Sequence, residues 1–165
     1  FENFVLNSLL GGGMISTLYQ QIRERRGLAY SVYSMIHSFT DFGFNTIYAG
    51  CAADKVKIVL ALIMKELERV VKVGVTHRQI EFFKRQLKGN LLLAADDVES
   101  RMSSLGINEM VFHEYRSVDS VVAEMEAVTP ESMRAFLNTV DLNQLAILIL
   151  GSGVKPKVKT WIEKL

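Results

Sequence analysis

The residues best suited to chemistry in this sequence are an arginine and a tyrosine seven positions apart, Arg23 and Tyr30. Arg23 opens a short basic run directly after an apolar position of a predicted helix, and Tyr30 lies on the strand predicted to follow. A helix that passes into a strand through Gly27 would bring the two side chains together at the sheet edge. A guanidinium and a phenol both donate to a carbonyl oxygen that gains negative charge. The alternative reading is that the basic run is the solvated end of a helix.

The glycine triplet at residues 11–13 suggests a phosphate-binding loop at first sight. A nucleotide-binding glycine loop follows a strand and opens a helix, so that its amides face the phosphate. Here the triplet follows a helix-patterned segment, and no lysine-serine or lysine-threonine pair comes after it as in a P-loop. We therefore expect a bend between two helices, or a close approach between backbones, at the triplet.

The three histidines do not have the spacing of a metal site. The zinc-peptidase patterns His-Glu-x-x-His and its inverse, His-x-x-Glu-His, are absent, and His37, His77 and His113 lie far apart. His77 and Glu81 fall one helical turn apart, but two ligands leave a catalytic zinc site incomplete, so we interpret them as a surface pair. The segment is therefore expected to hold no metal of its own.

The usual signals of a catalytic nucleophile are incomplete as well. Cys51 is the single cysteine; it has no CxxC partner and no nearby histidine, so we interpret it as a small buried apolar residue. The "GSG" at residues 151–153 lacks the Gly-x-Ser-x-Gly frame of a hydrolase. Read alone, the sequence contains no complete catalytic apparatus.

The composition limits the classes of partner and compartment. Lys and Arg number 19 against 18 Asp and Glu, a net charge of +1, so no overall field attracts nucleic acid. With 49% hydrophobic and 22% charged residues the chain is expected to be a soluble globular protein, and its apolar runs are too short to span a bilayer. A single cysteine forms no internal disulfide and favours a reducing compartment such as the cytoplasm, with the periplasm and an organelle left open.

The elements that would position the arginine and the tyrosine are two helical segments and two strands. Apolar spacing predicts a helix over residues 1–9 and another over 15–22, with Gly27 as a left-handed stop. Residues 28–36 and 44–51 are rich in aromatic and β-branched residues and predict two strands. The short loop between these strands indicates an antiparallel hairpin.

Helical periodicity dominates the rest of the sequence. Asp54 is a predicted cap for a helix over residues 56–70, and Thr76 with Gln79 forms a predicted capping box for the next helix, which runs to about residue 97. Further elements are predicted as helices at residues 99–112, 119–128, from the Thr129 cap onward and at 155–165, and as a buried strand at 144–150.

The order of these elements predicts an α+β fold in two layers, with helices packed on one face of a mostly antiparallel sheet. Residues 1–165 are expected to form a single domain. The first helix begins at Phe1 without a cap, and about three strands make a thin sheet. We therefore expect the chain to be a piece of a longer polypeptide that lacks one or more of the first strands of the fold.

The stretch "LLGGGMISTLYQQIRERRGLAYSVYS" resembles the signature of the C-terminal half of the pitrilysin/insulinase family. These are zinc peptidases of the inverted His-x-x-Glu-His type, and they include the mitochondrial processing peptidase. Members tend to read "IREKRGLAY" at this place, and this chain differs only by Arg25 for lysine. The likeness continues through "DFGFNTIYAGC", "GVTHRQIEFFKRQLKGNLLL" and "VTPESMRAFLNTVDLNQLAILILG", and so covers nearly the whole chain.

The resemblance implies a processing-peptidase-like metallohydrolase fold, in which two similar α+β halves close around an extended peptide. In the family, zinc and the glutamate base lie in the N-terminal half or in a partner subunit. The C-terminal half contributes an arginine and a tyrosine that touch the bound peptide and help to stabilise the tetrahedral intermediate. Carried onto this sequence, those residues are Arg23 and Tyr30, and the glycine triplet is a bend between helices.

The function implied by the resemblance is that of the C-terminal, substrate-binding half of a zinc-dependent metalloendopeptidase that hydrolyses peptides or unfolded segments. Its partners would be a peptide substrate and a zinc-bearing half or subunit of the same family. Because no zinc motif is present, the segment alone should be inactive. Two alternatives are a non-catalytic subunit or scaffold that retains the fold, and an isolated module that binds peptides at the sheet edge.

Overall fold

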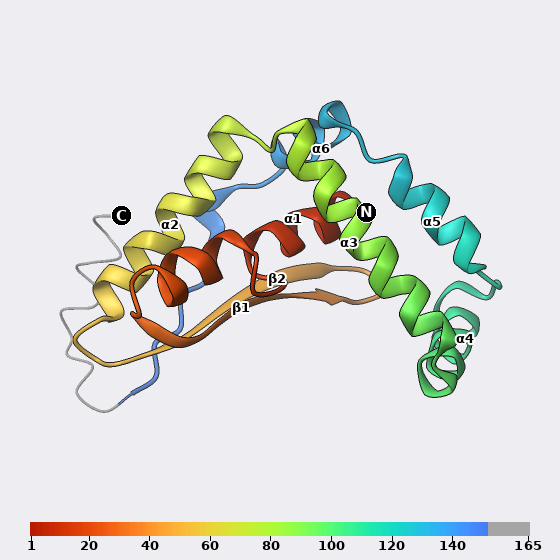
Figure 1. The fold of residues 1–165 in the computed structure, drawn as a ribbon, viewed down its shortest axis with the longest axis horizontal. Helices are drawn as coiled ribbons and strands as arrows, with labels where there is room; N and C mark the ends of the chain where they lie inside the picture. The colour runs from red at the N-terminus through yellow and green to blue at the C-terminus, as the bar shows by residue number, and fades with distance from the viewer. Residues whose placement is uncertain (152–165) are drawn as a thin grey trace.

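The computed structural model describes residues 1–151, which form an α+β structure in two layers (Figure 1). An antiparallel sheet forms one layer, and helices lie on one side of it. This arrangement confirms the predicted fold class. The helix predicted at residues 155–165 lies outside the described residues. Within residues 1–151, no helix is both long and apolar enough to cross a membrane.

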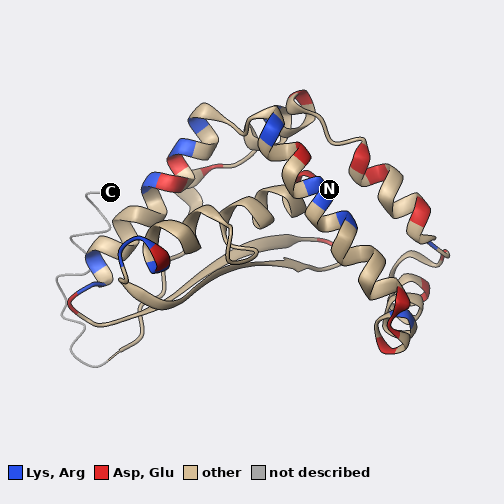
Figure 2. Ribbon diagram, in the orientation of Figure 1, with Lys and Arg blue, Asp and Glu red and all other residues tan. Residues whose placement is uncertain are grey.

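The sheet is a hairpin of β1 (Ala29–Ser38) and β2 (Gly43–Cys51), as predicted. Side chains alternate between its two faces, so Val32 is buried against the helices. The other face carries aromatic residues, among them Tyr33 and Tyr48, whose stacked rings lie 5.0 Å apart. Neither strand contains Lys, Arg, Asp or Glu, and the sheet is accordingly tan in Figure 2.

The core lies between the sheet and α1 (Glu2–Leu10), the helix predicted at the start of the chain. Val5 and Leu9 of this helix are fully buried. Removing such side chains from water is the main source of stability in a domain of this size. The buried apolar side chains of the core are Val5, Leu6, Leu9, Leu10, Leu18, Ile22, Ala29, Val32, Val59, Val70, Ile80, Phe83, Val128, Met133 and Leu137.

The helix predicted at residues 15–22 contains a π-helix, η1 (Tyr19–Glu24). Its wider turn is seen where the Arg25 N–H donates to the carbonyl of Gln20, five residues back, at 3.0 Å. The segment ends at Gly27, whose φ of +57° confirms the predicted left-handed stop. Apolar spacing did not predict the π-helix, because a single wide turn leaves the buried face almost unchanged.

The helix α2 (Val56–Val73) follows the hairpin. The prediction that Asp54 caps this helix is wrong, since the N-cap residue is Lys55 and it makes no side-chain cap bond. The Asp54 carboxylate instead lies 2.8 Å from the Lys55 ammonium nitrogen. Because the N-cap position is Lys55, Asp54 precedes the position from which a side chain caps the helix.

The predicted capping box of the next helix, α3 (His77–Asp96), is confirmed. The Thr76 hydroxyl accepts from the Gln79 N–H at 3.3 Å, and the Gln79 side chain accepts from the Thr76 N–H at 3.0 Å. Thr129 caps a later helix, as predicted. The remaining described helical elements are α4 (Val98–Phe112), α5 (Val118–Glu126), α6 (Pro130–Leu137) and the 3₁₀ turn η2 (Leu142–Gln144).

The prediction of a buried strand at residues 144–150 is wrong. These residues form no strand, and the sheet contains only β1 and β2 among residues 1–151. Leu148 and Leu150 are 93% and 96% exposed. An apolar run becomes a buried strand only when neighbouring strands pair with it. That the sheet lacks its first strands stays a prediction.

Candidate functional site

The two residues singled out in the sequence, Arg23 and Tyr30, lie against each other. The guanidinium carbon of Arg23 is 5.0 Å from the centre of the Tyr30 ring and 4.9 Å from the centre of the Tyr19 ring. Such distances are typical of cation–π contacts. The faces of the two rings hold the cation, and the N–H donors in the plane of the guanidinium stay free for a ligand. Tyr30 is 82% exposed, so its hydroxyl is accessible to a ligand.

The turn between η1 and β1 sets this arrangement. The Gly27 N–H donates to the Arg23 carbonyl and the Leu28 N–H to the Ile22 carbonyl, both at 2.9 Å. Ile22 is fully buried and anchors the end of η1 in the core. The left-handed conformation at Gly27 then sends the chain directly into β1, which places Tyr30 beside Arg23.

The positive charge of Arg23 is only weakly neutralised. Its one ion pair in the described structure joins its Nε to a Glu24 oxygen at 4.0 Å, between side chains 37% and 51% exposed. An exposed pair at that distance contributes little energy. Arg26, three residues on, instead donates to the carbonyl of Gln21 at 2.8 Å. Arg23 is therefore available to a carbonyl or carboxylate oxygen of a ligand.

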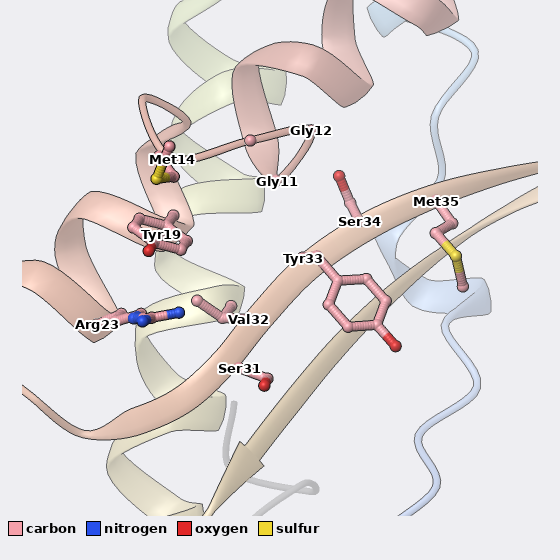
Figure 3. A pocket seen from close by; sticks show the side chains of 11 residues that line it. Gly11, Gly12, Met14, Tyr19, Arg23, Ser31, Val32, Tyr33, Ser34 and Met35 are labelled. Carbon is pink, nitrogen blue, oxygen red and sulfur yellow. The ribbon is translucent and has the colours of Figure 1, made fainter.

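A cavity of about 430 Å³ opens beside Arg23, between the glycine triplet and β1 (Figure 3). In Figure 3 Tyr19 and Arg23 face β1 across it, and the triplet and Met14 form its far end. Tyr30 is not among the residues that line it. The lining consists of Gly11, Gly12, Gly13, Met14, Tyr19, Arg23, Ser31, Val32, Tyr33, Ser34 and Met35.

Sequence reasoning found Arg23 but missed the rest of the cavity. Every second residue of a strand points to the same face, so the sequence could have predicted that one face of β1 carries Ser31, Tyr33 and Met35. Tyr19 was predicted as an apolar helix position, and its contact with Arg23, four residues on, was not predicted although side chains at this spacing are neighbours on a helix.

The glycine triplet is a bend between helices, as predicted. The N–H groups of Gly11 and Gly12 both donate to the Asn7 carbonyl, at 3.0 and 2.9 Å, and so close the end of α1. These amides are not turned outward, which excludes a phosphate cradle built from them. A Cβ at Gly11 would lie 2.4 Å from the Ser34 backbone nitrogen, so only glycine fits where the bend meets β1.

The described residues contain no group of three or more His, Cys, Asp and Glu side chains that could hold a metal ion. His37 stacks on Phe44 with ring centres 4.6 Å apart. Glu81, the expected surface partner of His77, accepts from Lys84 at 3.0 Å. Zinc coordination by residues 1–151 therefore does not fit this structure. The "GSG" segment lies largely outside the described residues.

Cys51 ends β2 and is half-buried against the core. Burial raises the pKa of its thiol above the ordinary value, and the neighbouring Asp54 carboxylate raises it further. Both effects disfavour the thiolate, which is the reactive form of cysteine. The structure thus agrees with Cys51 as a small core residue and gives no support to a nucleophile.

Relatives of known sequence share most of this chain. A zinc protease of Streptomyces coelicolor, named as uncharacterized, is 40% identical over 147 residues, which cover 89% of this chain and 32% of the relative. The uncharacterized zinc protease YmxG of Bacillus subtilis is 36% identical over 157 residues, covering 94% of this chain and 38% of the relative. The chain thus spans about a third of the length of these relatives.

Solved structures share the fold. A conserved protein of Enterococcus faecalis is 28% identical and superimposes with a TM-score of 0.72, covering 83% of this chain and 32% of that protein. A Pseudomonas fluorescens protein described as a peptidase M16 inactive domain is 24% identical and also has a TM-score of 0.72, over 83% of this chain and 33% of that protein; at this identity it supports the fold alone.

The family described as "Peptidase M16 inactive domain" matches residues 1–87, which contain the glycine triplet, η1 and the hairpin. The predicted resemblance to the C-terminal half of the pitrilysin/insulinase family is thereby confirmed. The chain belongs to the M16 peptidase family, as a C-terminal domain of its inactive type.

Proposed function

We propose that this chain is the C-terminal, substrate-binding half of a zinc-dependent metalloendopeptidase that hydrolyses peptides or unfolded segments. The observation that carries the proposal is the contact of Arg23 with the exposed Tyr30, in which the guanidinium carbon lies 5.0 Å from the ring centre. An open cavity lies beside Arg23. The names of the relatives, which are zinc proteases, agree with it. The partners of the chain would be a peptide substrate and a zinc-bearing half or subunit of the same family.

The proposed roles of the two residues follow from their donors. Arg23 binds a carbonyl oxygen of the peptide with its planar guanidinium, and the rings of Tyr19 and Tyr30 hold that cation in place. Tyr30 donates its hydroxyl proton as a hydrogen bond to the oxygen that becomes negative when the peptide carbonyl is attacked. Zinc, held by the zinc-bearing half or subunit, would supply Lewis-acid chemistry.

The test is Tyr30→Phe in the full-length protein. Loss of a single donor to a developing oxyanion lowers kcat by about 10²-fold, and zinc content should be unchanged. Tyr115→Phe is the matched control, since Tyr115 is also an exposed tyrosine with an arginine beside it, Arg101 at 3.2 Å. Turnover of Tyr30→Phe equal to that of the control would refute the role of Tyr30.

Arg23→Ala tests the binding role. We expect a fall in kcat/KM with little change in melting temperature, because Arg23 is partly exposed and makes no strong ion pair. Arg26→Ala, on the same turn, should leave kcat/KM near that of the unmodified protein. A large loss of melting temperature in Arg23→Ala alone would instead assign Arg23 to the fold and favour a scaffold.

A further inference from the structure

Arg23 has a long side chain, and few contacts hold its guanidinium in place. Among residues 1–151 its one ion pair is the exposed 4.0 Å contact with Glu24, which contributes little energy. An unrestrained arginine loses rotamer freedom when it binds a ligand, and this loss weakens binding. The described contacts that can restrain it are the rings of Tyr19 and Tyr30, whose centres lie 4.9 and 5.0 Å from the guanidinium carbon.

The two rings differ in how firmly the fold holds them. Tyr30 is 82% exposed, and in the proposed function its hydroxyl donates to an oxygen of the substrate. Tyr19 is half-buried and packs against the core. Two nearby side chains of the same segment, Leu18 and Ile22, are buried and fix the backbone on either side of Tyr19. Tyr19 therefore offers Arg23 a fixed ring face, whereas the ring of Tyr30 is free to move with a ligand.

The contact between Tyr19 and Arg23 is formed within one element. Both residues belong to η1, four positions apart, and side chains at this spacing are neighbours on a helix surface. In Figure 3 the Tyr19 ring and the Arg23 guanidinium lie one above the other on the side of the cavity that faces β1. The contact needs no residue outside η1, so it persists wherever η1 keeps its place in the core.

The ring face of Tyr19, rather than its hydroxyl, makes this contact. Among residues 1–151 the Tyr19 hydroxyl takes part in no hydrogen bond, while the Arg23 guanidinium lies over the ring. A cation is attracted to the face of an aromatic ring, whether tyrosine or phenylalanine, and an aliphatic side chain offers no such attraction. Phenylalanine at this position would keep the contact, and leucine would keep only the apolar packing.

We propose that Tyr19 is a positioning residue, which holds the Arg23 guanidinium in the orientation that binds a carbonyl oxygen of the peptide. This inference rests on the proposed function, because it concerns how Arg23 meets the substrate. The Tyr19 ring restrains the guanidinium before the peptide arrives, so less freedom is lost on binding. Tyr19 thus acts on KM, in contrast with Tyr30, which acts on the developing oxyanion and therefore on kcat.

The first measurement is steady-state hydrolysis of a peptide by the full-length protein. Tyr19→Leu should raise KM about fivefold and leave kcat nearly unchanged, because a cation–π contact contributes about that much to binding. Tyr19→Phe should have the KM of the unmodified protein. Tyr48→Leu is the control, since Tyr48 stacks on Tyr33 and is not among the residues that line the cavity. Equal KM values for the leucine and phenylalanine variants of Tyr19 would overturn the inference.

A double variant distinguishes positioning from direct contact with the peptide. If Tyr19 acts through Arg23, Tyr19→Leu should have no further effect on KM in protein that carries Arg23→Ala. An equal loss in both backgrounds would mean that the Tyr19 ring touches the peptide itself, and the positioning role would be wrong. The leucine and phenylalanine variants should melt at similar temperatures, because both keep the apolar packing. If the leucine variant does not fold, Tyr19→Met takes its place, since methionine adapts to irregular spaces.

A readout without substrate tests the geometry alone. Phenylglyoxal modifies arginine side chains, and mass spectrometry of the digested full-length protein gives the rate of modification at each arginine. The rings of Tyr19 and Tyr30 flank the Arg23 guanidinium, so Tyr19→Leu should raise the rate at Arg23 several-fold. The rate at Arg26, which is exposed on the same turn, should stay unchanged. Equal rates at Arg23 in the leucine and phenylalanine variants would show that Tyr19 does not restrain it.

The outcomes also separate this inference from the proposed function. If the full-length protein hydrolyses peptides and Tyr19→Leu changes neither KM nor the modification rate, the function stands and the positioning role is wrong. If it hydrolyses no peptide, the proposed function is wrong, and the dissociation constant of a labelled peptide, measured by fluorescence anisotropy, takes the place of KM. Binding about fivefold weaker in Tyr19→Leu then supports the positioning role, and unchanged or absent binding overturns it.

Discussion

Gly11 sits where the end of α1 touches β1, and this single position fixes how the two layers meet. Its carbonyl accepts from the Ser34 N–H at 3.0 Å, and its own N–H closes α1 through Asn7. The backbone can come this close only because the residue has no side chain: a Cβ would lie within 2.4 Å of the Ser34 nitrogen and 2.8 Å of its hydroxyl oxygen. Steric contact with backbone cannot be relieved by a change of rotamer.

Gly11→Ala should accordingly lower the free energy of unfolding by about 3 kcal/mol. Gly89→Ala is the control, because Gly89 lies within α3 with nothing within 4 Å of the position of a Cβ. There alanine should raise stability by about 0.5–1 kcal/mol, since it is the better helix former. Urea unfolding of both variants, followed by circular dichroism, measures the difference. Similar stability of the two variants would contradict the close approach at Gly11.

Cys51 should react slowly with thiol reagents. Burial and the Asp54 carboxylate raise the pKa of its thiol, so the fraction of thiolate at a given pH is smaller in the folded protein than in the unfolded chain. The rate of labelling by a disulfide reagent should therefore rise with pH at higher values for folded than for denatured protein. Asp54→Asn removes the like charge and should accelerate labelling of the folded form modestly. Equal rates in the folded and denatured states would contradict the burial of Cys51.

Among single residues, the contact between Arg23 and Tyr30 could be predicted from the sequence, because it follows from the direct passage of the helix into the strand. Because the helix passes directly into the strand through Gly27, Arg23 and Tyr30 lie close together at one edge of the sheet. Tyr19 packs partly against the core, as its helical spacing predicted, but the contact of its ring with the Arg23 guanidinium was not predicted. Residues four apart are neighbours on a helix surface, so the spacing of Tyr19 and Arg23 was an available signal for this contact.

The elements are joined chiefly by apolar packing, and α3 is joined to the α5–α6 connection by a buried lysine as well. Lys84 is 5% exposed, and its ammonium donates to the carbonyls of Glu126 at 2.8 Å and Val128 at 3.2 Å. It also bonds to the Glu81 carboxylate at 3.0 Å. A buried cation persists only when its donors are satisfied, and these three oxygens satisfy it.

Lys84→Met should therefore be destabilising although it keeps the length of the side chain. The carbonyls of Glu126 and Val128 would lose their partner in a buried place, at a cost of about 2–3 kcal/mol. Lys88→Met, one turn along α3, removes an ammonium that is 43% exposed and 3.5 Å from the Glu126 carboxylate. That pair is worth at most about 1 kcal/mol. Thermal unfolding should separate the two variants clearly, and equal melting temperatures would show that Lys84 is not a structural tie.

Elements with strong local signals could be predicted, and those that depend on distant partners could not. The hairpin and the capping box at Thr76 carry their own turn and cap chemistry, and both are as predicted. Residues 144–150 have the composition of a buried strand, yet Leu148 and Leu150 are almost fully exposed. Composition favours a strand, but pairing decides it, and pairing is not encoded in the segment itself.

On the scale of the whole molecule, the chain covers about a third of its relatives, and its site is correspondingly one-sided. The described residues provide Arg23, Tyr30 and an edge strand, and no cluster of side chains able to hold a metal. In the proposed function these residues bind and orient the peptide, and metal-assisted attack is assigned to the rest of the full-length protein. We therefore expect that removal of the metal abolishes peptide hydrolysis but not peptide binding.

Chelation of the full-length protein should abolish peptide hydrolysis and leave peptide binding beside Arg23 and Tyr30 intact, because the described residues contain no group of side chains that could hold a metal. Added zinc should restore hydrolysis. The 165-residue chain by itself should not hydrolyse peptides with or without zinc, provided that circular dichroism shows it to be folded. Metal-dependent hydrolysis by this chain alone would contradict the division, since it would require a zinc site formed by the chain itself. Parallel loss of binding and hydrolysis on chelation would instead show that the metal organises the peptide site.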